Sequence, residues 1–370
     1  AASSGGAMLP PVMGAVAFIM SDLTNIAYSK IAWASLLPAL LYYVAIYLLV
    51  HNEAIRNNEG RMAESEIVGL PAALRQGWRH LFPLLALIGF LVAGYTPVYV
   101  AAGSTAAVIV LSWFSPKQAI GPRRFVECCT DTIHQLVPLV GAVAGAGIVI
   151  GCIEISGLAG KFTLLISYLS GGLLVPTLIL AAVFLVLLGM GMPTPAVYIT
   201  GAALLAPTLI QKFGLPEMQA HLFMLYFACL SAITPPVAVA NFAAGAIAGA
   251  NPMALGPYAV KLAVGGFVLP FFFLFNPGLN MQGGLAAIAP AVAFGTALVV
   301  FGSYAMQGWF GRRHIGAIER LVLVAAGVAC IVPRLDVQLA GAAAGILALL
   351  AVRWLKAPVP AAAPACAPQG

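Results

Sequence analysis

Residues 185–241 read LVLLGMGMPTPAVYITGAALLAPTLIQKFGLPEMQAHLFMLYFACLSAITPPVAVAN, and two breaks in this apolar stretch decide the fold. The first break is Gly189-Met190-Gly191-Met192-Pro193-Thr194-Pro195, and the second is Thr234-Pro235-Pro236. Proline lacks the amide donor that a helix needs, and glycine loses more backbone entropy than other residues when it is ordered. Neither segment therefore continues a helix.

Breaks of this kind have a special meaning in lipid, because each unpaired backbone group there costs several kcal/mol. Irregular backbone at membrane depth is tolerated where it is buried in protein or lines a cavity, and it marks the binding site of many secondary transporters. The alternative interpretation is a plain loop between two spans, followed by a proline kink. We expect a re-entrant helical hairpin (173–188 and 193–210) and one broken span (221–250).

The composition is that of an all-α polytopic membrane protein. The chain has 370 residues, of which 62% are hydrophobic and 8% are charged, whereas soluble domains carry about 25% charged residues. The net charge of +6 is not a nucleic-acid signal, because the basic residues lie between apolar segments. Six cysteines without CxxC spacing predict neither a disulfide framework nor a metal site. The chain lacks the HExxH, GxSxG and P-loop motifs, which argues against an enzyme and against direct use of ATP.

Hydropathy divides the chain into five parts. Residues 1–50 contain a broken helix and a span, and residues 51–127 contain polar loops (51–80 and 115–131) around a helical hairpin that turns at 95–97. Residues 128–280 contain a span, an interfacial arm, the re-entrant hairpin, the broken span and a further span; three more apolar segments follow in 281–356, and 357–370 is a disordered Ala/Pro tail. Tyr42, Tyr43 and Trp33 fit an aromatic belt, and His221 fits an interfacial position. Glu154, near the end of an apolar run, is either a proton site or a plain interfacial carboxylate.

The distribution of Lys and Arg predicts the orientation. With the loop 51–80 in the cytoplasm, twelve basic residues fall on the cytoplasmic side and four on the other; Lys261 lies near the cytoplasmic end of its span. The four are Lys30, Lys161, Lys212 and Arg334, and the twelve are Arg56, Arg61, Arg75, Arg79, Lys117, Arg123, Arg124, Arg312, Arg313, Arg320, Arg353 and Lys356. This count places the C-terminus in the cytoplasm.

Two segments of the chain resemble each other. Met8-Leu9-Pro10-Pro11-Val12 matches Ile233-Thr234-Pro235-Pro236-Val237, and a small-residue run and a proline-containing span follow each. In this threading the first segment runs outward and the second inward, which predicts inverted repeats of the kind found in secondary transporters. The first repeat is incomplete, and the chain opens on AASSGGAMLPPVMGAVAFIM without an initiator Met. We therefore expect the C-terminal portion of a longer permease.

At these motifs the chain resembles the large membrane subunit of the TRAP (tripartite ATP-independent periplasmic) transporters, and most of all the fused permeases of their TAXI branch. The matching stretches are ASSGGAMLPPVMGAVAFIM, LLGMGMPTPAVYITGAALLAP, AHLFMLYFACLSAITPPVAVANFAAGAIAGANP and NPGL, within 1–279. The resemblance implies an elevator-type transporter in the bacterial inner membrane. It also implies import of an organic acid delivered by a periplasmic binding protein, driven by a sodium or proton gradient.

The candidate binding residues lie at the breaks. The helix after Pro193 points its positive end at the cavity, which suits a carboxylate, and hydroxyl and carbonyl oxygens near Pro235 suit sodium. The full set is Gly189, Gly191, Met192, Pro193, Thr194, Ser231, Thr234, Pro235, Pro236 and Asn241, with Ser3, Ser4, Gly5, Pro10 and Pro11 as the symmetry partner. No catalytic residue and no cofactor other than sodium is expected. A non-transporting membrane scaffold and an ion channel are the alternative functions.

Overall fold

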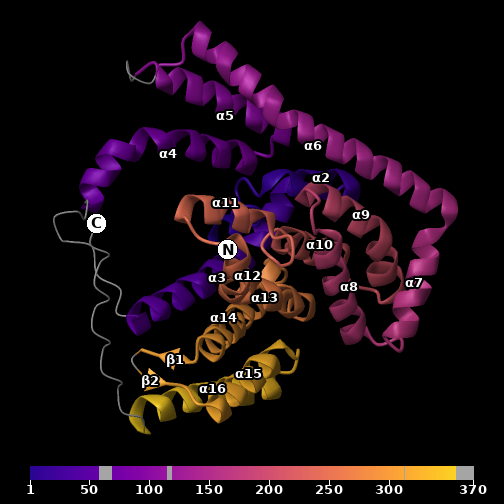
Figure 1. Cartoon of the computed structure of the whole chain (residues 1–370), viewed down its shortest axis with the longest axis vertical. Helices are drawn as coiled ribbons and strands as arrows, with labels where there is room; N and C mark the ends of the chain where they lie inside the picture. The colour runs from indigo at the N-terminus through magenta and orange to yellow at the C-terminus, as the bar shows by residue number, and fades with distance from the viewer. Residues whose placement is uncertain (58–68, 115–118, 312, 356–370) are drawn as a thin grey trace.

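The computed structural model describes residues 1–57, 69–114, 119–311 and 313–355, and these residues are almost entirely helical (Figure 1). The α-helices are α1 (Ala2–Gly5), α2 (Gly14–Thr24), α3 (Tyr28–Asn57), α4 (Leu70–Val92), α5 (Pro97–Ser112), α6 (Pro122–Ser156), α7 (Leu158–Leu169), α8 (Leu174–Leu188), α9 (Thr194–Ala206), α10 (Glu217–Ser231), α11 (Val239–Ala248), α12 (Pro252–Leu262), α13 (Val264–Phe275), α14 (Leu285–Gln307), α15 (Ala317–Ile331) and α16 (Leu335–Leu355). A π-helix, η2 (Pro207–Lys212), and a 3₁₀-helix, η3 (Pro277–Asn280), complete the helical part.

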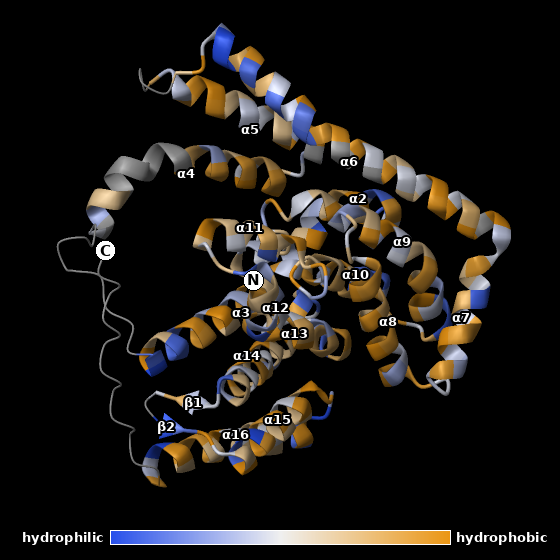
Figure 2. Cartoon of the chain, in the orientation of Figure 1, coloured by the Kyte–Doolittle hydropathy of each residue, from blue (hydrophilic) through white to orange (hydrophobic). Residues whose placement is uncertain are grey.

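Within the described part of the chain, four helical stretches are long and apolar enough to cross a membrane: Tyr28–Asn57, Pro252–Phe275, Leu285–Gln307 and Leu335–Leu355. A fifth candidate is the bent pair Val143–Ile153 and Leu158–Leu169, whose axes meet at 79°. Hydrophobic residues predominate along most helices (Figure 2), and many large apolar side chains, such as Trp33, Leu164 and Ile247, are exposed, as expected where lipid is the solvent. The prediction of an all-α polytopic membrane protein is confirmed.

Helix α10 forms the centre of the molecule. Every residue from Gln219 to Ser231 is buried, because α2, α8, α9 and α13 pack around it. Its sequence, EMQAHLFMLYFACLS, is apolar on most faces, which is typical of a helix that touches protein all round. Aromatic rings fix its contact with α13: Tyr226 lies edge-on to Phe273, with 5.5 Å between ring centroids.

Both breaks expected from the sequence are present. Helices α8 and α9 are separated at residues 189–193, and α10 and α11 at residues 232–238. The 232–238 break also shares its backbone conformation with the segment before α2. Both Pro-Pro bonds (Pro10-Pro11 and Pro235-Pro236) are cis, and the residue before each following helix, Met13 or Ala238, has a left-handed φ.

Three predicted loop boundaries are wrong, because helices extend into the polar segments. Helix α3 continues to Asn57, past the boundary at residue 50, and α6 begins at Pro122, before the boundary at 127. The i,i+4 ion pair between Arg123 and Glu127 (3.1 Å) supports the polar first turns of α6. Helix α4 begins at Leu70, inside the segment 51–80 that was expected to be a loop, whereas α5 and the helical arm α7 have the expected positions. The centre of the 51–80 loop and the Ala/Pro tail lie outside the described residues.

Polar side-chain contacts connect α3 to α12 and α14 near one of its ends and to η3 near the other. At one end Glu53 forms an ion pair with Lys261 of α12 (3.4 Å) and accepts a hydrogen bond from Gln307 of α14. At the other end, Asn280 donates from Nδ2 to the carbonyl of Ala34 (2.9 Å). Ala34 and Glu53 are about 28 Å apart along the helix axis, close to the ~30 Å thickness of a bilayer core.

The C-terminal hairpin α15–α16 packs on α14. Gly341 faces α15, where an added Cβ would lie 2.7 Å from Ala329 Cβ, and Gly345 faces Phe301 of α14 at 2.4 Å. This Gly341-x-x-x-Gly345 pair resembles a helix-dimerisation motif, and here it serves close packing within the chain. The sequence did not predict the short antiparallel pair of β1 (Trp309–Phe310) and β2 (Arg313–His314) that joins α14 to α15.

Candidate functional site

The two breaks in 185–241 meet in the folded protein. Helices α8 and α10 each have 15 residues and are therefore about 22 Å long, shorter than the ~30 Å core of a bilayer. Their C-terminal ends touch: a Cβ added to Gly189 would lie 2.0 Å from Ser231 Oγ. Glycine at 189 is what allows the hairpin tip to rest on the end of α10.

The hairpin itself is a close pair of short helices. Gly201 of α9 leaves no room for a side chain, because its Cβ would lie 2.3 Å from a methyl of Leu185 in α8. At the tip Gly191 has a φ of +88°, a conformation that favours glycine, and open space surrounds its Cβ position. Thr194 begins α9 and is half-buried, and no side chain caps the helix N-terminus after Pro193. The tip therefore presents a helix N-terminus and a flexible turn.

Side chains of the second break stabilise the end of α10. Ser231 Oγ donates to the carbonyl of Ala228 (2.7 Å), and Thr234 Oγ1 donates to the carbonyl of Leu230 (2.8 Å). In each case the oxygen lone pairs remain available to a further donor or to a cation.

Asn241, at the start of α11, is 4% exposed and spans the same break. Its Nδ2 donates to the carbonyl of Ile233 (3.3 Å), which leaves the amide oxygen Oδ1 as an acceptor. Pro235 packs on Gly256 of α12, where a Cβ would lie 2.6 Å from Pro235 Cγ. Pro236 is exposed.

The first broken segment lies against the same central helix. Helix α1 contains Ser3, Ser4 and Gly5 and contacts both α10 and α3. Gly5 packs against the rings of Tyr42 and Tyr43, each 2.8 Å from its Cβ position. Ser3 is exposed and Ser4 is half-buried. The structure thus places these residues beside α10, and it places Gly189 in direct contact with Ser231.

The turn at Pro10-Pro11 is held by Tyr28 of α3. Its hydroxyl lies 2.7 Å from the carbonyl oxygen of Pro11 and 3.0 Å from that of Val12, and it donates to this pair. The assignment of Tyr42 to an aromatic belt is wrong: Tyr42 is fully buried, and its hydroxyl donates to the carbonyl of Ala1 (2.8 Å). Position in an apolar run gave no sign of this contact across the fold.

A buried polar pair near the hairpin was not predicted. The hydroxyl of Tyr198 in α9 lies 2.8 Å from Nδ1 of His221 in α10, and His221 is 6% exposed. The side chain of Gln219, two residues before His221 in α10, is fully buried, and neither of its polar atoms has a hydrogen-bond partner among the described residues. The side chain of Glu154 lies outside the described part of the structure.

Within the described ranges, no group of three or more His, Cys, Asp or Glu residues is placed to hold a metal ion. The oxygen atoms at the breaks come instead from hydroxyls, an amide and backbone carbonyls. Such neutral oxygens suit a weakly held monovalent cation better than a transition metal, which prefers nitrogen and sulfur ligands.

Comparison with known proteins identifies the family. The model for "Tripartite ATP-independent periplasmic transporter, DctM component" matches residues 1–308. The chain belongs to this family. The match extends past the 1–279 expected from sequence motifs and covers every candidate site residue, together with α14. No curated protein matches the chain.

Membership in the DctM family makes the chain a permease component of a TRAP secondary transporter and a multi-pass membrane protein. DctM proteins are transporters and not enzymes, and they work with a periplasmic binding protein and a small membrane component. The hairpin 309–314 and helices α15 and α16 lie beyond the matched region.

Proposed function

We propose that the chain is the permease component of a TAXI-branch transporter that imports an organic acid delivered by a periplasmic binding protein, driven by a sodium or proton gradient. The observation that carries this proposal is the contact of Gly189 with Ser231, which joins the two breaks into one candidate site. Two short helices that end against each other create uncapped helix termini inside a membrane protein, and such termini bind ions and carboxylates in secondary transporters.

Each side of this site has a different chemical role in the proposal. The N-terminus of α9 at Thr194 carries the positive end of a helix dipole, which favours the carboxylate of the substrate. Ser231, Thr234 and Asn241 provide neutral oxygens for a coupling cation. In a sodium-coupled cycle the cation and the carboxylate neutralise each other in one cavity. In a proton-coupled cycle, a titrating group replaces the cation.

The first experiment asks whether transport occurs and what drives it. The complete permease is reconstituted in liposomes with its binding protein, and uptake of radiolabelled succinate, lactate and pyruvate is measured. We expect accumulation of at least one acid that needs the binding protein and is abolished by either a sodium ionophore or a protonophore. Flux without the binding protein that never exceeds equilibrium would indicate a channel. Absence of uptake would indicate a scaffold.

The second experiment locates the site with matched threonine variants. Thr234 and Thr177 both donate to a carbonyl four residues earlier (2.8 Å each), but Thr177 lies in the first turn of α8, away from the breaks. Thr234→Ala should raise the half-saturating substrate or ion concentration about two- to twelve-fold, since one hydrogen bond contributes about 0.5–1.5 kcal/mol. Thr177→Ala should leave it unchanged. Equal effects of both variants would move the site away from Thr234.

A further inference from the structure

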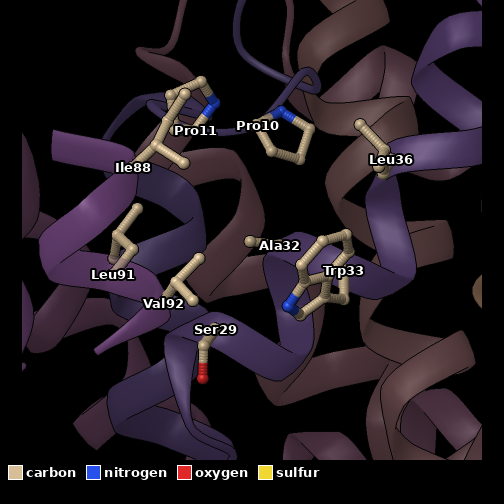
Figure 3. A pocket seen from close by; sticks show the side chains of 9 residues that line it. All are labelled: Pro10, Pro11, Ser29, Ala32, Trp33, Leu36, Ile88, Leu91 and Val92. Carbon is tan, nitrogen blue, oxygen red and sulfur yellow. The ribbon is translucent and has the colours of Figure 1, made fainter. Parts of the chain in front are cut away.

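A cavity adjoins the Pro10-Pro11 turn of the first broken segment. It has a volume of about 230 Å³ and lies between Pro10-Pro11, the first turns of α3 at Ala32 and Trp33, and the end of α4 at Leu91 and Val92 (Figure 3). The side chains of Leu91 and Val92 face Pro10, Pro11 and the indole ring of Trp33 across the cavity (Figure 3). The cavity therefore lies between the end of α4 on one side and α3 with the Pro10-Pro11 turn on the other.

We propose that this cavity holds part of one acyl chain of an anionic phospholipid, with the headgroup beside Lys30. This inference does not rest on the proposed transport function. Apart from the hydroxyl of Ser29 and the indole N–H of Trp33, the side chains that line the cavity are apolar. An apolar cavity of 150 Å³ stays dry and binds benzene, so 230 Å³ accommodates roughly nine carbon atoms by the same ratio. The cavity offers an organic acid no charged partner, only one hydroxyl and one indole N–H.

The position of the cavity fits a lipid that enters from the bilayer. Trp33 is 52% exposed and Val92 is 67% exposed although both line the cavity, so the opening lies on the outer surface. The cavity adjoins Ala34, whose carbonyl accepts the hydrogen bond from Asn280 at one end of the spanning part of α3. An indole with one exposed side is typical of the lipid headgroup level.

The charge next to the opening selects the headgroup. Lys30 follows Ser29 in the first turn of α3, and its side chain is exposed. One lysine near an anionic lipid surface contributes about 1 kcal/mol, which corresponds to about a fivefold preference for an anionic over a zwitterionic lipid. The acyl chain would fill the apolar space while the phosphate stays near the ammonium group.

The test is native mass spectrometry of the complete permease, released from detergent after incubation with equal amounts of palmitoyl-oleoyl phosphatidylglycerol and phosphatidylcholine. We expect one retained phospholipid, with about a fivefold preference for phosphatidylglycerol. Ala32→Phe fills the cavity and should abolish retention. Ala343→Phe, on an exposed position of α16, is the matched control and should retain the lipid. A thermal melt of each variant checks that it is folded.

Lys30→Glu provides a second test that leaves the cavity open. It should keep one lipid but lose the preference for phosphatidylglycerol, and this result decides the proposal alone if Ala32→Phe does not fold. Retention of detergent only, or retention unchanged in Ala32→Phe, would refute the acyl-chain site. An equal preference for both lipids in the unmodified protein would refute the role of Lys30.

Discussion

Replacing Gly189 with alanine perturbs the one contact that joins the two breaks. The added methyl would lie 2.0 Å from Ser231 Oγ and 2.3 Å from Ser231 Cβ, far inside van der Waals contact. Gly189 has a φ of −77°, which alanine adopts without strain, so the whole cost is steric. The hairpin tip and the end of α10 must separate to accommodate the methyl group.

The direction in which a Gly→Ala substitution changes folding stability distinguishes Gly189 from a glycine at an open helical position. Gly→Ala at an open helical position stabilises a protein by about 0.4–1 kcal/mol, whereas overpacking a closed contact costs about 1–3 kcal/mol. Gly160 of α7 is the control, because nothing lies within 4 Å of its Cβ position. We expect Gly189→Ala to lower the melting temperature and Gly160→Ala to maintain or raise it. If the displaced tip also misplaces the site, uptake falls about 5- to 160-fold over that energy range.

A second substitution at Ser231 should compensate for the steric clash in Gly189→Ala. Ser231→Gly removes both atoms that the new methyl meets, so Gly189→Ala with Ser231→Gly should recover most of the lost stability. Ser231→Ala keeps the Cβ at 2.3 Å and should rescue far less. The assays are thermal unfolding in detergent and uptake in liposomes, applied to Gly189→Ala, to Ser231→Gly, and to the double variants that combine Gly189→Ala with Ser231→Gly or with Ser231→Ala. A stable, active Gly189→Ala protein would refute the contact, and so would additive effects in the double variant.

Three further predictions follow from single features. Gly191→Val, at φ +88° in open space, should abolish uptake by straining the tip while the melting temperature changes little; near-normal uptake would remove the tip from the site. In a cysteine-free background, Ala317→Cys should resist an impermeant thiol reagent in intact cells, because it follows α14 on the predicted cytoplasmic side. Gln282→Cys precedes α14 on the opposite side and should react. The reverse pattern would show that the predicted membrane orientation is inverted. Gln338→Leu should lower the melting temperature, because it removes a 2.9 Å donor to Asn276 Oδ1 at a cost of about 1–3 kcal/mol; an unchanged melt would show that this bond contributes nothing.

The breaks were predictable from the sequence because they depend on local chemistry. Glycine and proline act on their own backbone, so Gly189–Pro195 and Pro235-Pro236 ended helices wherever the rest of the chain packed. The small-residue match between the two Pro-Pro segments also extends to backbone conformation, since Met13 and Ala238 share a left-handed φ. The inverted orientation of the repeats, the elevator motion and the TAXI branch remain predictions.

Features that depend on contacts between distant elements were not predictable. From the sequence, Tyr42 is predicted to be an interfacial aromatic residue. In the folded chain its hydroxyl instead donates to the carbonyl of Ala1, just before α1. The pairing of Tyr198 with His221 needs the crossing of α9 over α10. The polar segments after residues 50 and 121 are helical because charged side chains pair along the helix, which hydropathy does not register. Most candidate residues were found from type and spacing, but their contacts required the fold.

The way α15 and α16 attach has a consequence for how homologous permeases are compared. The family match ends at Gly308, yet Asn276, inside it, donates from Nδ2 to the carbonyl of Ile331 and accepts from Gln338, both outside it. Phe301 likewise packs on Gly345. The border of the family match therefore runs through a packed interface between the hairpin α15–α16 and the end of α13. A relative without this hairpin would lack the partners that Asn276 and Phe301 have here, so a comparison confined to the shared part would not reveal what these two residues do.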